Sequence, residues 1–127
     1  LYMEPTAVLA PTNSARVCQE EIFGPFATFL VYGTIDDAIR IANESPFGLV
    51  SYIWSQDLGE VMRVSREVRA GTVWVNTPMM RELRAPFGGY KQSGVGRDGP
   101  TSSVEFFTEL KATTIPIDPV TMTRFGA

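Results

Sequence analysis

Two loops of this chain combine side chains suited to binding or catalysis with glycine and proline. The first loop, residues 20–25, reads Glu-Glu-Ile-Phe-Gly-Pro. The second loop, residues 86–99, reads Pro-Phe-Gly-Gly-Tyr-Lys-Gln-Ser-Gly-Val-Gly-Arg-Asp-Gly. Each loop places an aromatic ring beside glycine, and glycine lets a backbone approach a flat ligand closely. The two loops together therefore predict a binding site for a planar group.

The first loop pairs an acid with a ring. Gly24 and Pro25 favour a fixed turn, which would hold the ring of Phe23 at a set distance from the carboxylate of Glu21. A carboxylate accepts hydrogen bonds from a ribose diol, as the acid of a dinucleotide site does. An aromatic ring beside it can pack against a nicotinamide. A solvated turn is the commoner interpretation of two adjacent glutamates, but the residues that follow them favour cofactor binding here.

The residue types that the chain lacks exclude several mechanisms. It contains no histidine, so no Ser-His-Asp triad, Cys-His pair or histidine metal site can be built from its residues alone. Its one cysteine, Cys18, has no histidine partner, and we interpret it as a small packed side chain rather than a nucleophile. A single cysteine forms no internal disulfide, which favours a reducing, cytoplasmic location.

Two stretches of the second loop come close to nucleotide-binding motifs, and we accept neither as one. Residues 94–99 satisfy G-x-G-x-x-G, with Asp118 near the spacing of a ribose-binding acid, but the preceding residues 90–93 do not read as a buried strand. The Lys-Gln-Ser sequence fails as a phosphate loop because no glycine stands directly before the lysine and no serine or threonine directly after it. We therefore interpret residues 94–99 as a tight turn.

Composition places the chain among ordinary globular domains. It has 127 residues, of which 44% are hydrophobic, enough for one core. The net charge of −3 argues against a nucleic-acid partner, which would require a basic surface. No apolar run approaches the roughly 20 residues that span a bilayer, and no secretory leader is visible at the start. We therefore expect neither nucleic acid nor a membrane as a partner.

Strands and helices are expected to alternate between the two loops. Thr34 and Asp57 are the expected first residues of two helices, and the first helix has apolar residues at the i, i+3, i+4, i+7 spacing of a buried stripe. Strands are expected at residues 6–10, 26–32, 49–54 and 72–75. Short connections between alternating strands and helices predict a parallel α/β sheet.

The rest of the chain is less regular. Residues 76–99 show no usable periodicity and are expected to form a long ordered loop, which in a compact domain is usually functional. A short helix is expected near residues 102–107 and a strand near residues 112–117. The segment after Pro119 is expected to be poorly ordered.

These motifs resemble the C-terminal part of an NAD(P)-dependent aldehyde dehydrogenase. Residues 20–25 resemble the E-E-[IV]-F-G-P signature of that family, which implies that Glu21 and Phe23 contact the nicotinamide ribose. Asn76 and the later Pro-Phe-Gly-Gly sequence resemble the loop that lines the substrate tunnel, which implies that Phe87 lies beside the reacting aldehyde. Supporting matches are Tyr2 with Pro5-Thr6, Phe47-Gly48-Leu49, the Gly71-Thr72-Val73-Trp74-Val75-Asn76 run and Thr108-Glu109-Leu110-Lys111.

The resemblance implies an α/β fold that forms the C-terminal half of the catalytic domain, with a mostly open parallel sheet and flanking helices. Residues 1–110 would be a partial catalytic domain, residues 111–118 an oligomerisation strand and residues 119–127 a tail. The nucleophilic cysteine, the general-base glutamate and the Rossmann domain of the family would lie upstream. The implied partners are an aldehyde, the N-terminal part of the same enzyme and further copies in a homodimer or homotetramer. The chain alone is expected to be inactive.

The residues before the Pro-Phe-Gly-Gly sequence indicate the substrate. Met-Arg-Glu-Leu-Arg at residues 80–84 resembles the branch that oxidises hydroxymuconic, aminomuconic and carboxymethyl-hydroxymuconic semialdehydes. An arginine fork can hold the carboxylate of such a substrate. We favour Arg81 over Arg84 as the anchor, and we place Asn76 and Met79 in the same tunnel. The alternative is an ordinary loop ion pair between Arg81 and Glu82.

A further expectation concerns the assembly of subunits. The resemblance implies an ion pair between Arg97 and Glu109 that ties the active-site loop to the subunit interface. Without the resemblance, Glu109 would be interpreted as a solvent-exposed charge.

The alternatives left open are a broad-specificity or betaine-type aldehyde oxidiser and a non-catalytic assembly module with the same fold. The cofactor is NAD or NADP, and the sequence does not distinguish them.

Overall fold

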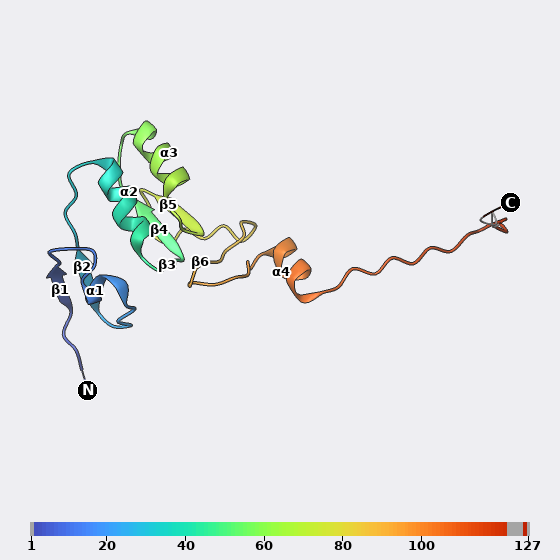
Figure 1. Cartoon of the computed structure of the whole chain (residues 1–127), viewed down its shortest axis with the longest axis horizontal. Coiled ribbons are helices and arrows are strands. Elements are labelled where there is room, and N and C mark those ends of the chain that lie inside the picture. Colours follow the sequence, from blue (N-terminus) through green and yellow to red (C-terminus); the bar gives the residue numbers. More distant parts are fainter. Residues whose placement is uncertain (1, 122–125, 127) are drawn as a thin grey trace.

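The structure is a computed structural model that describes residues 2–121 and residue 126 (Figure 1). Short strands and helices follow one another, mostly in alternation, from residue 6 to residue 107. The described elements are β1 (Thr6–Leu9), α1 (Arg16–Gln19), β2 (Phe26–Phe29), α2 (Ile35–Glu44), β3 (Phe47–Gly48), β4 (Val50–Ile53), α3 (Leu58–Glu67), β5 (Thr72–Val75), β6 (Tyr90–Lys91) and α4 (Pro100–Phe107).

The strands pair two by two. β1 pairs with β2 and β4 with β5, both in parallel register, and the second pair is joined through α3. β3 and β6 form a short antiparallel pair that aligns Phe47 with Lys91. The mixed α/β class and its parallel pairing are confirmed. The single continuous sheet is not formed by the described residues, because each strand hydrogen-bonds to only one neighbour.

The two longer helices begin where the sequence predicts. The hydroxyl of Thr34 accepts a hydrogen bond from the backbone N–H of Asp37 at 3.1 Å, and the carboxylate of Asp57 accepts one from the N–H of Glu60 at 3.0 Å. Each bond satisfies an N–H that the first helical turn leaves without a partner. Both helix N-caps are therefore confirmed.

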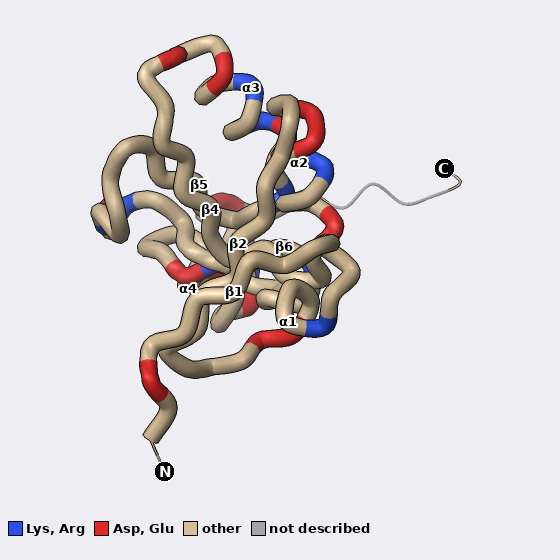
Figure 2. The backbone as a smooth tube through the Cα atoms, turned by 90° about the vertical axis from the view of Figure 1, so that its left-hand side faces the viewer, with Lys and Arg blue, Asp and Glu red and all other residues tan. Residues whose placement is uncertain are grey.

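Helices α2 and α3 contact each other and lie against the β4–β5 pair (Figure 1). Their apolar stripes supply two of the few buried side chains, Ile39 and Val61, each 7% exposed. Figure 2 shows acidic and basic residues interspersed along the same two helices. An apolar inner stripe with a charged outer face is the pattern of a helix that covers a sheet.

Three segments differ from the sequence prediction. α1 was not expected, and the predicted strand at residues 26–32 ends at Phe29. The predicted loop at residues 76–99 contains β6 and a backbone bridge between Phe87 and Asp98. Strands as short as β3 and β6 carry too few residues for a periodic sequence signal.

The predicted strand at residues 112–117 is wrong for this chain on its own. Residues 108–121 are neither helix nor strand, and in Figure 1 they run away from the other elements. A strand requires a hydrogen-bonded neighbour, and none of the described residues lies alongside this segment. Pairing with another chain stays a prediction. Of the predicted tail, residues 122–125 and 127 lie outside the described residues.

Much apolar surface is open to solvent. The large hydrophobic side chains of β1, β2 and the segment after β2 include Leu9, Phe29 and Val31, which are exposed by half or more. A contiguous exposed apolar surface of this kind is typical of an interaction site. Among the described residues, no helix is long and apolar enough to cross a membrane.

Candidate functional site

The two adjacent glutamates of the first loop differ in their surroundings. The carboxylate of Glu20 accepts a hydrogen bond from Nε of Arg16 at 2.7 Å, and this bond lowers the pKa of Glu20. Glu21 instead lines a cavity of about 590 Å³. The structure therefore assigns the surface ion pair to Glu20 and places Glu21 at the border of a space that a ligand could enter.

Phe23 presents its ring to solvent. Its backbone has φ of 53°, in the left-handed region that only a constrained turn imposes on a bulky residue. The side chain is 93% exposed. A ring held outward by a strained turn has its faces available to a planar partner, but the structure does not bring it against the second loop.

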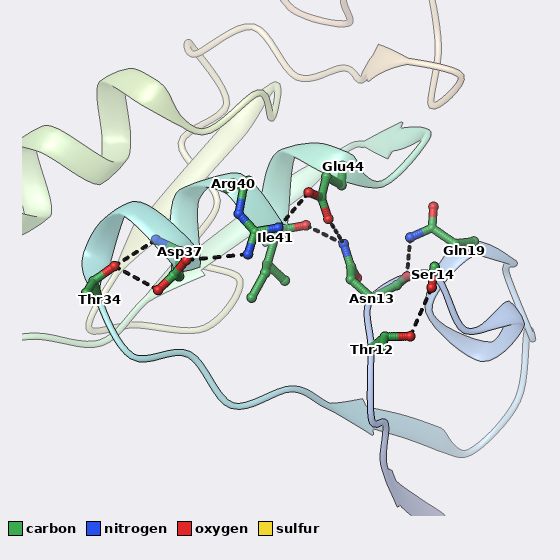
Figure 3. A network of polar contacts seen from close by, with 9 residues as sticks. All are labelled: Thr12, Asn13, Ser14, Gln19, Thr34, Asp37, Arg40, Ile41 and Glu44. Carbon is green, nitrogen blue, oxygen red and sulfur yellow. Dashed lines mark hydrogen bonds and ion pairs between the residues drawn. The ribbon is translucent and has the colours of Figure 1, made fainter.

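A polar network fixes the segment that leads into the first loop (Figure 3). Nδ2 of Asn13 donates to the carbonyl of Ile41 at 3.0 Å and to the carboxylate of Glu44 at 2.8 Å. Nε2 of Gln19 donates to the carbonyl of Asn13 at 2.7 Å. The end of α1 is thereby tied to the last turn of α2, and this fixes where the following Glu21 can lie.

The cavity beside Glu21 joins the first loop to the second. Gln92 and Ser93 of the second loop also line it. The hydroxyl of Ser93 accepts a hydrogen bond from the N–H of Gly48 at 2.9 Å, and the N–H of Gln92 donates to the carbonyl of Pro46 at 3.1 Å. These bonds hold the second loop against β3, so Glu21 and the second loop share one cavity.

The second loop is folded back on itself. Phe87 and Asp98 exchange two backbone hydrogen bonds of 2.7 Å. Within the loop, Nη1 of Arg97 donates to the carbonyls of Gly89 at 2.9 Å and Gly96 at 2.8 Å. The Arg97 guanidinium also lies 5.2 Å from the centre of the Tyr90 ring. Both ends of the loop are therefore held together, and the position of Phe87 is fixed.

Phe87 and Arg81 border a second cavity of about 330 Å³. The Arg81 guanidinium carbon lies 5.6 Å from the centre of the Phe87 ring, within the range of a cation–π contact. Trp74 and Met80 also line this cavity; Nε1 of Trp74 donates to the carbonyl of Met80 at 2.6 Å, and the Trp74 ring stacks on Tyr52. The structure thus brings together the cation and the ring that the sequence analysis placed at the substrate.

A third cavity, of about 300 Å³, makes the two sites neighbours. It shares Leu49 and Ser93 with the cavity of Glu21, and it shares Phe87 and Asp98 with the cavity of Arg81. The three cavities therefore follow one another along the second loop.

Arg84 lies outside these cavities. Its Nε and Nη2 donate to the two carboxylate oxygens of Glu82 at 2.8 and 2.7 Å, and its backbone N–H donates to the same carboxylate at 2.9 Å. These bonds lower the pKa of Glu82 to about 2. The loop ion pair that the sequence analysis weighed for Arg81 is thus made by Arg84, and no ion pair of Arg81 occurs within residues 2–121.

Two further residues predicted to line the substrate tunnel, Asn76 and Met79, are not among the residues that line the cavity of Arg81 and Phe87. The side-chain amide of Asn76 donates to the carbonyl of Ser55 at 2.8 Å and accepts from its N–H at 3.0 Å, so both ends of the amide hold the backbone after β4. Met79 is 74% exposed. Asn76 and Met79 both have positive φ, of 52° and 50°, which marks a constrained turn entering the Arg81 segment.

Arg97 and Glu109 are not paired in this structure. The Arg97 guanidinium is engaged within its own loop, and Glu109 is exposed. The ion pair between them therefore stays a prediction for an assembled protein. No cluster of three His, Cys, Asp or Glu residues able to hold a metal ion occurs in the described part of the chain.

Lys91 is a residue that the sequence analysis missed. Its ammonium donates to the carbonyls of Asn43 at 3.0 Å and Ser45 at 2.8 Å, at the C-terminal end of α2. Burial, followed by the nearby charge of Arg69, lowers the pKa of Lys91. A cation at a helix C-terminus is stabilising. Only the tertiary structure reveals this contact, because the lysine and its acceptors are far apart in sequence.

Comparison with known proteins gives a consistent picture. The model of the family described as "Aldehyde dehydrogenase family" matches residues 1–113. The chain is 42% identical to 2-aminomuconic semialdehyde dehydrogenase of Danio rerio over 114 residues, which are 90% of this chain and 23% of that protein. It is 43% identical to 2-hydroxymuconic semialdehyde dehydrogenase of Pseudomonas putida over 110 residues, 87% of this chain and 23% of that protein.

A solved structure agrees. The indole-3-acetaldehyde dehydrogenase of P. syringae, a C302A mutant in complex with NAD+ and IAA, superposes with a TM-score of 0.82 at 45% identity. The match covers 88% of this chain and 23% of that one. The present chain therefore spans about a quarter of the length of the proteins it resembles.

Proposed function

The chain belongs to the aldehyde dehydrogenase family, and we propose that it is the C-terminal part of an enzyme that oxidises an aldehyde to a carboxylate with NAD(P)+. The observation that carries this proposal is the row of adjoining cavities along the second loop, with Glu21 at one end and Arg81 with Phe87 at the other. These adjoining cavities support the proposal because they lie near both an acid suited to a cofactor and a ring suited to an aldehyde. The reactive cysteine and the general base are assigned to the upstream part of the enzyme.

The residues present fit the nicotinamide-ribose end of the cofactor. Glu21 lines a cavity, and the Phe23 ring is open to a planar partner. Glu21 would accept hydrogen bonds from the ribose diol, and Phe23 would pack against the nicotinamide and limit its orientation. NAD(P)+, when bound, accepts the hydride that leaves the aldehyde. The adenosine end, which distinguishes NAD from NADP, is assigned to the upstream domain.

We propose that the substrate is a carboxylated semialdehyde. Phe87 forms an apolar wall beside the aldehyde, and the Arg81 guanidinium across the ring provides a cation for the distant carboxylate. Asn76 would support the wall by holding the backbone after β4, and the exposed Met79 would lie at the mouth of the tunnel. Arg84 is engaged with Glu82, so the substrate-binding role considered for it passes to Arg81.

Arg81→Gln in the full-length protein tests this assignment. With adipic semialdehyde as the acidic substrate and hexanal as its uncharged counterpart, KM for the acid should rise about 10- to 100-fold, the loss expected for a hydrogen bond to a charged group. KM for hexanal should change by less than about threefold, since only packing on Phe87 is altered. Arg66→Gln, an exposed arginine on α3, is the matched control. Equal effects on both substrates would favour a broad-specificity or betaine-type oxidiser instead.

The third possibility, an assembly module without catalysis, is tested by cofactor binding. The full-length protein should bind NAD+ or NADP+, and Glu21→Gln should weaken that binding because a neutral amide accepts hydrogen bonds less strongly than a carboxylate. Glu4→Gln removes the charge of an exposed glutamate outside the proposed site and serves as the control. Absence of binding to either cofactor would leave assembly as the only role.

We further propose that residues 1–110 belong to the catalytic domain and that residues 111–118 pair with another subunit of a homodimer or homotetramer. Residues 108–121 are extended, and the side chains of Leu110, Ile115 and Ile117 are exposed. An extended segment with open backbone groups is suited to adding a strand to another sheet. Glu109 would then reach Arg97, and Glu109→Lys should weaken cofactor affinity and oligomer stability together. Unchanged cofactor affinity in that variant would count against the ion pair.

A further inference from the structure

We propose that Arg84 is a positioning residue for substrate charge: by holding the carboxylate of Glu82, it keeps the guanidinium of Arg81 available to an acidic substrate. This inference rests on the proposed function. It assigns Arg84 a role other than direct contact with the substrate. In this role Arg84 prevents the Glu82 carboxylate from competing with the substrate carboxylate for Arg81.

The first step is the geometry of the carboxylate. Glu82 borders the same cavity as Arg81 and Phe87. Both of its oxygens are nevertheless occupied by Arg84, at 2.8 and 2.7 Å, and the Arg84 backbone N–H adds a third bond at 2.9 Å. A two-pronged guanidinium–carboxylate pair is the most specific geometry that these two groups can form. The Glu82 carboxylate, at the border of the cavity, is thereby held by Arg84, which does not line the cavity.

The second step concerns Arg81. It is the direct chain neighbour of Glu82, yet its guanidinium lies over the Phe87 ring at 5.6 Å. A cation stacked on a ring keeps its N–H groups at the edge of the guanidinium plane, where a carboxylate can approach. If Glu82 were not held by Arg84, the same N–H groups would be within reach of an adjacent carboxylate.

The third step is the local charge. Arg81, Glu82 and Arg84 together carry one net positive charge. Without the charge of Arg84 the three positions would be neutral, and the Glu82 carboxylate would both repel an acidic substrate and compete for Arg81. The pair with Arg84 is exposed, Arg84 being 86% exposed, so its contribution to stability is small. Its proposed effect is therefore on specificity rather than on folding.

Kinetics with a matched pair of substrates test the inference in the full-length protein. Arg84→Gln should raise KM for adipic semialdehyde about fivefold, as expected for an exposed charge interaction, with kcat nearly unchanged. KM for hexanal should stay within about twofold, because an uncharged aldehyde does not sense the competition. The double variant Glu82→Gln with Arg84→Gln has the net charge of the wild type and no competing carboxylate, so it should return KM for the acid to within about twofold of the wild-type value.

The possible outcomes distinguish this inference from the proposed function on which it rests. If Arg81→Gln discriminates between the two substrates but Arg84→Gln does not, the positioning role is overturned and the proposed function stands. If the double variant stays as impaired as Arg84→Gln, Glu82 is no competitor and the inference is wrong. If Arg84→Gln weakens both substrates equally, Arg84 has a general structural role instead. A full-length protein that oxidises neither aldehyde would overturn both proposals.

Discussion

Gly71→Ala is the sharpest test of how the second loop is held. Gly71 lies just before β5, where the chain passes the backbone of the loop that carries Phe87. A methyl carbon at Gly71 would lie 2.8 Å from the carbonyl carbon of Gly88, and closer still to its oxygen. It would also lie 3.4 Å from Cα of Gly89. All of these atoms are backbone, so no flexible side chain can move aside.

The size of the effect follows from the shift that the methyl group requires. Carbon atoms pack at about 3.5–4.0 Å, and the carbonyl oxygen of Gly88 lies closer than its carbon, so the loop must move by at least about 1 Å. Overpacking of this kind costs about 1–3 kcal/mol of stability. A displacement of about 1 Å at a substrate-positioning residue can lower activity about 100-fold. Because Phe87 directly precedes Gly88, we expect kcat/KM for hexanal to fall about 100-fold.

Both quantities are measurable in the full-length protein, kcat/KM by initial rates and stability by urea denaturation. Gly33→Ala is the matched control, because its methyl group would meet only the Asp37 carboxylate at 3.8 Å. It should change stability by no more than about 0.5 kcal/mol. A Gly71→Ala protein that matches this control in both measurements would refute the close approach of β5 to the second loop.

Three further predictions concern other contacts. The Glu82 carboxyl should titrate near pH 2 by NMR rather than at its ordinary pKa of 4.5; the ion pair with Arg84 stabilises the loop above pH 4.5 and is lost as the pH falls through about 2, and Arg84→Gln should move the titration upward. A midpoint near 4.5 in the wild type would show that the pair is not formed. Lys91→Met should lower the free energy of unfolding by about 1 kcal/mol through loss of its bonds to the end of α2, whereas Lys111→Met, an exposed position, should not. The chain on its own should elute in size-exclusion chromatography as an oligomer or aggregate, because its strand edges and apolar surface are open; a stable 14.0 kDa monomer would contradict this.

Local signals were sufficient for the regular elements. Thr34 and Asp57 are caps because their short polar side chains satisfy backbone N–H groups two or three residues ahead, an interaction within one turn of chain. β5 begins and ends where its run of β-branched and aromatic residues does. The parallel pairing of β4 and β5 follows from the helix between them, since a crossover of that length returns the chain in the same direction.

The loops required the tertiary structure. Their residue types indicated binding, but the partners of the charged side chains did not follow from spacing. Glu20 rather than Glu21 pairs with Arg16, and Arg84 rather than Arg81 pairs with Glu82. In each case two neighbours of like charge compete for one partner, and the backbone turn decides between them.

The sequence by itself determined the family, the α/β class and the helices, because a motif and a hydrophobic period are properties of consecutive residues. Only the tertiary structure decided that Glu21 shares a cavity with Ser93, that Phe87 lies under Arg81, and that residues 112–117 have no strand partner among the described residues. These are contacts, or missing contacts, between segments distant in sequence. The positions of such segments depend on the packing of α2, α3 and β3 between them, and no local pattern encodes that packing.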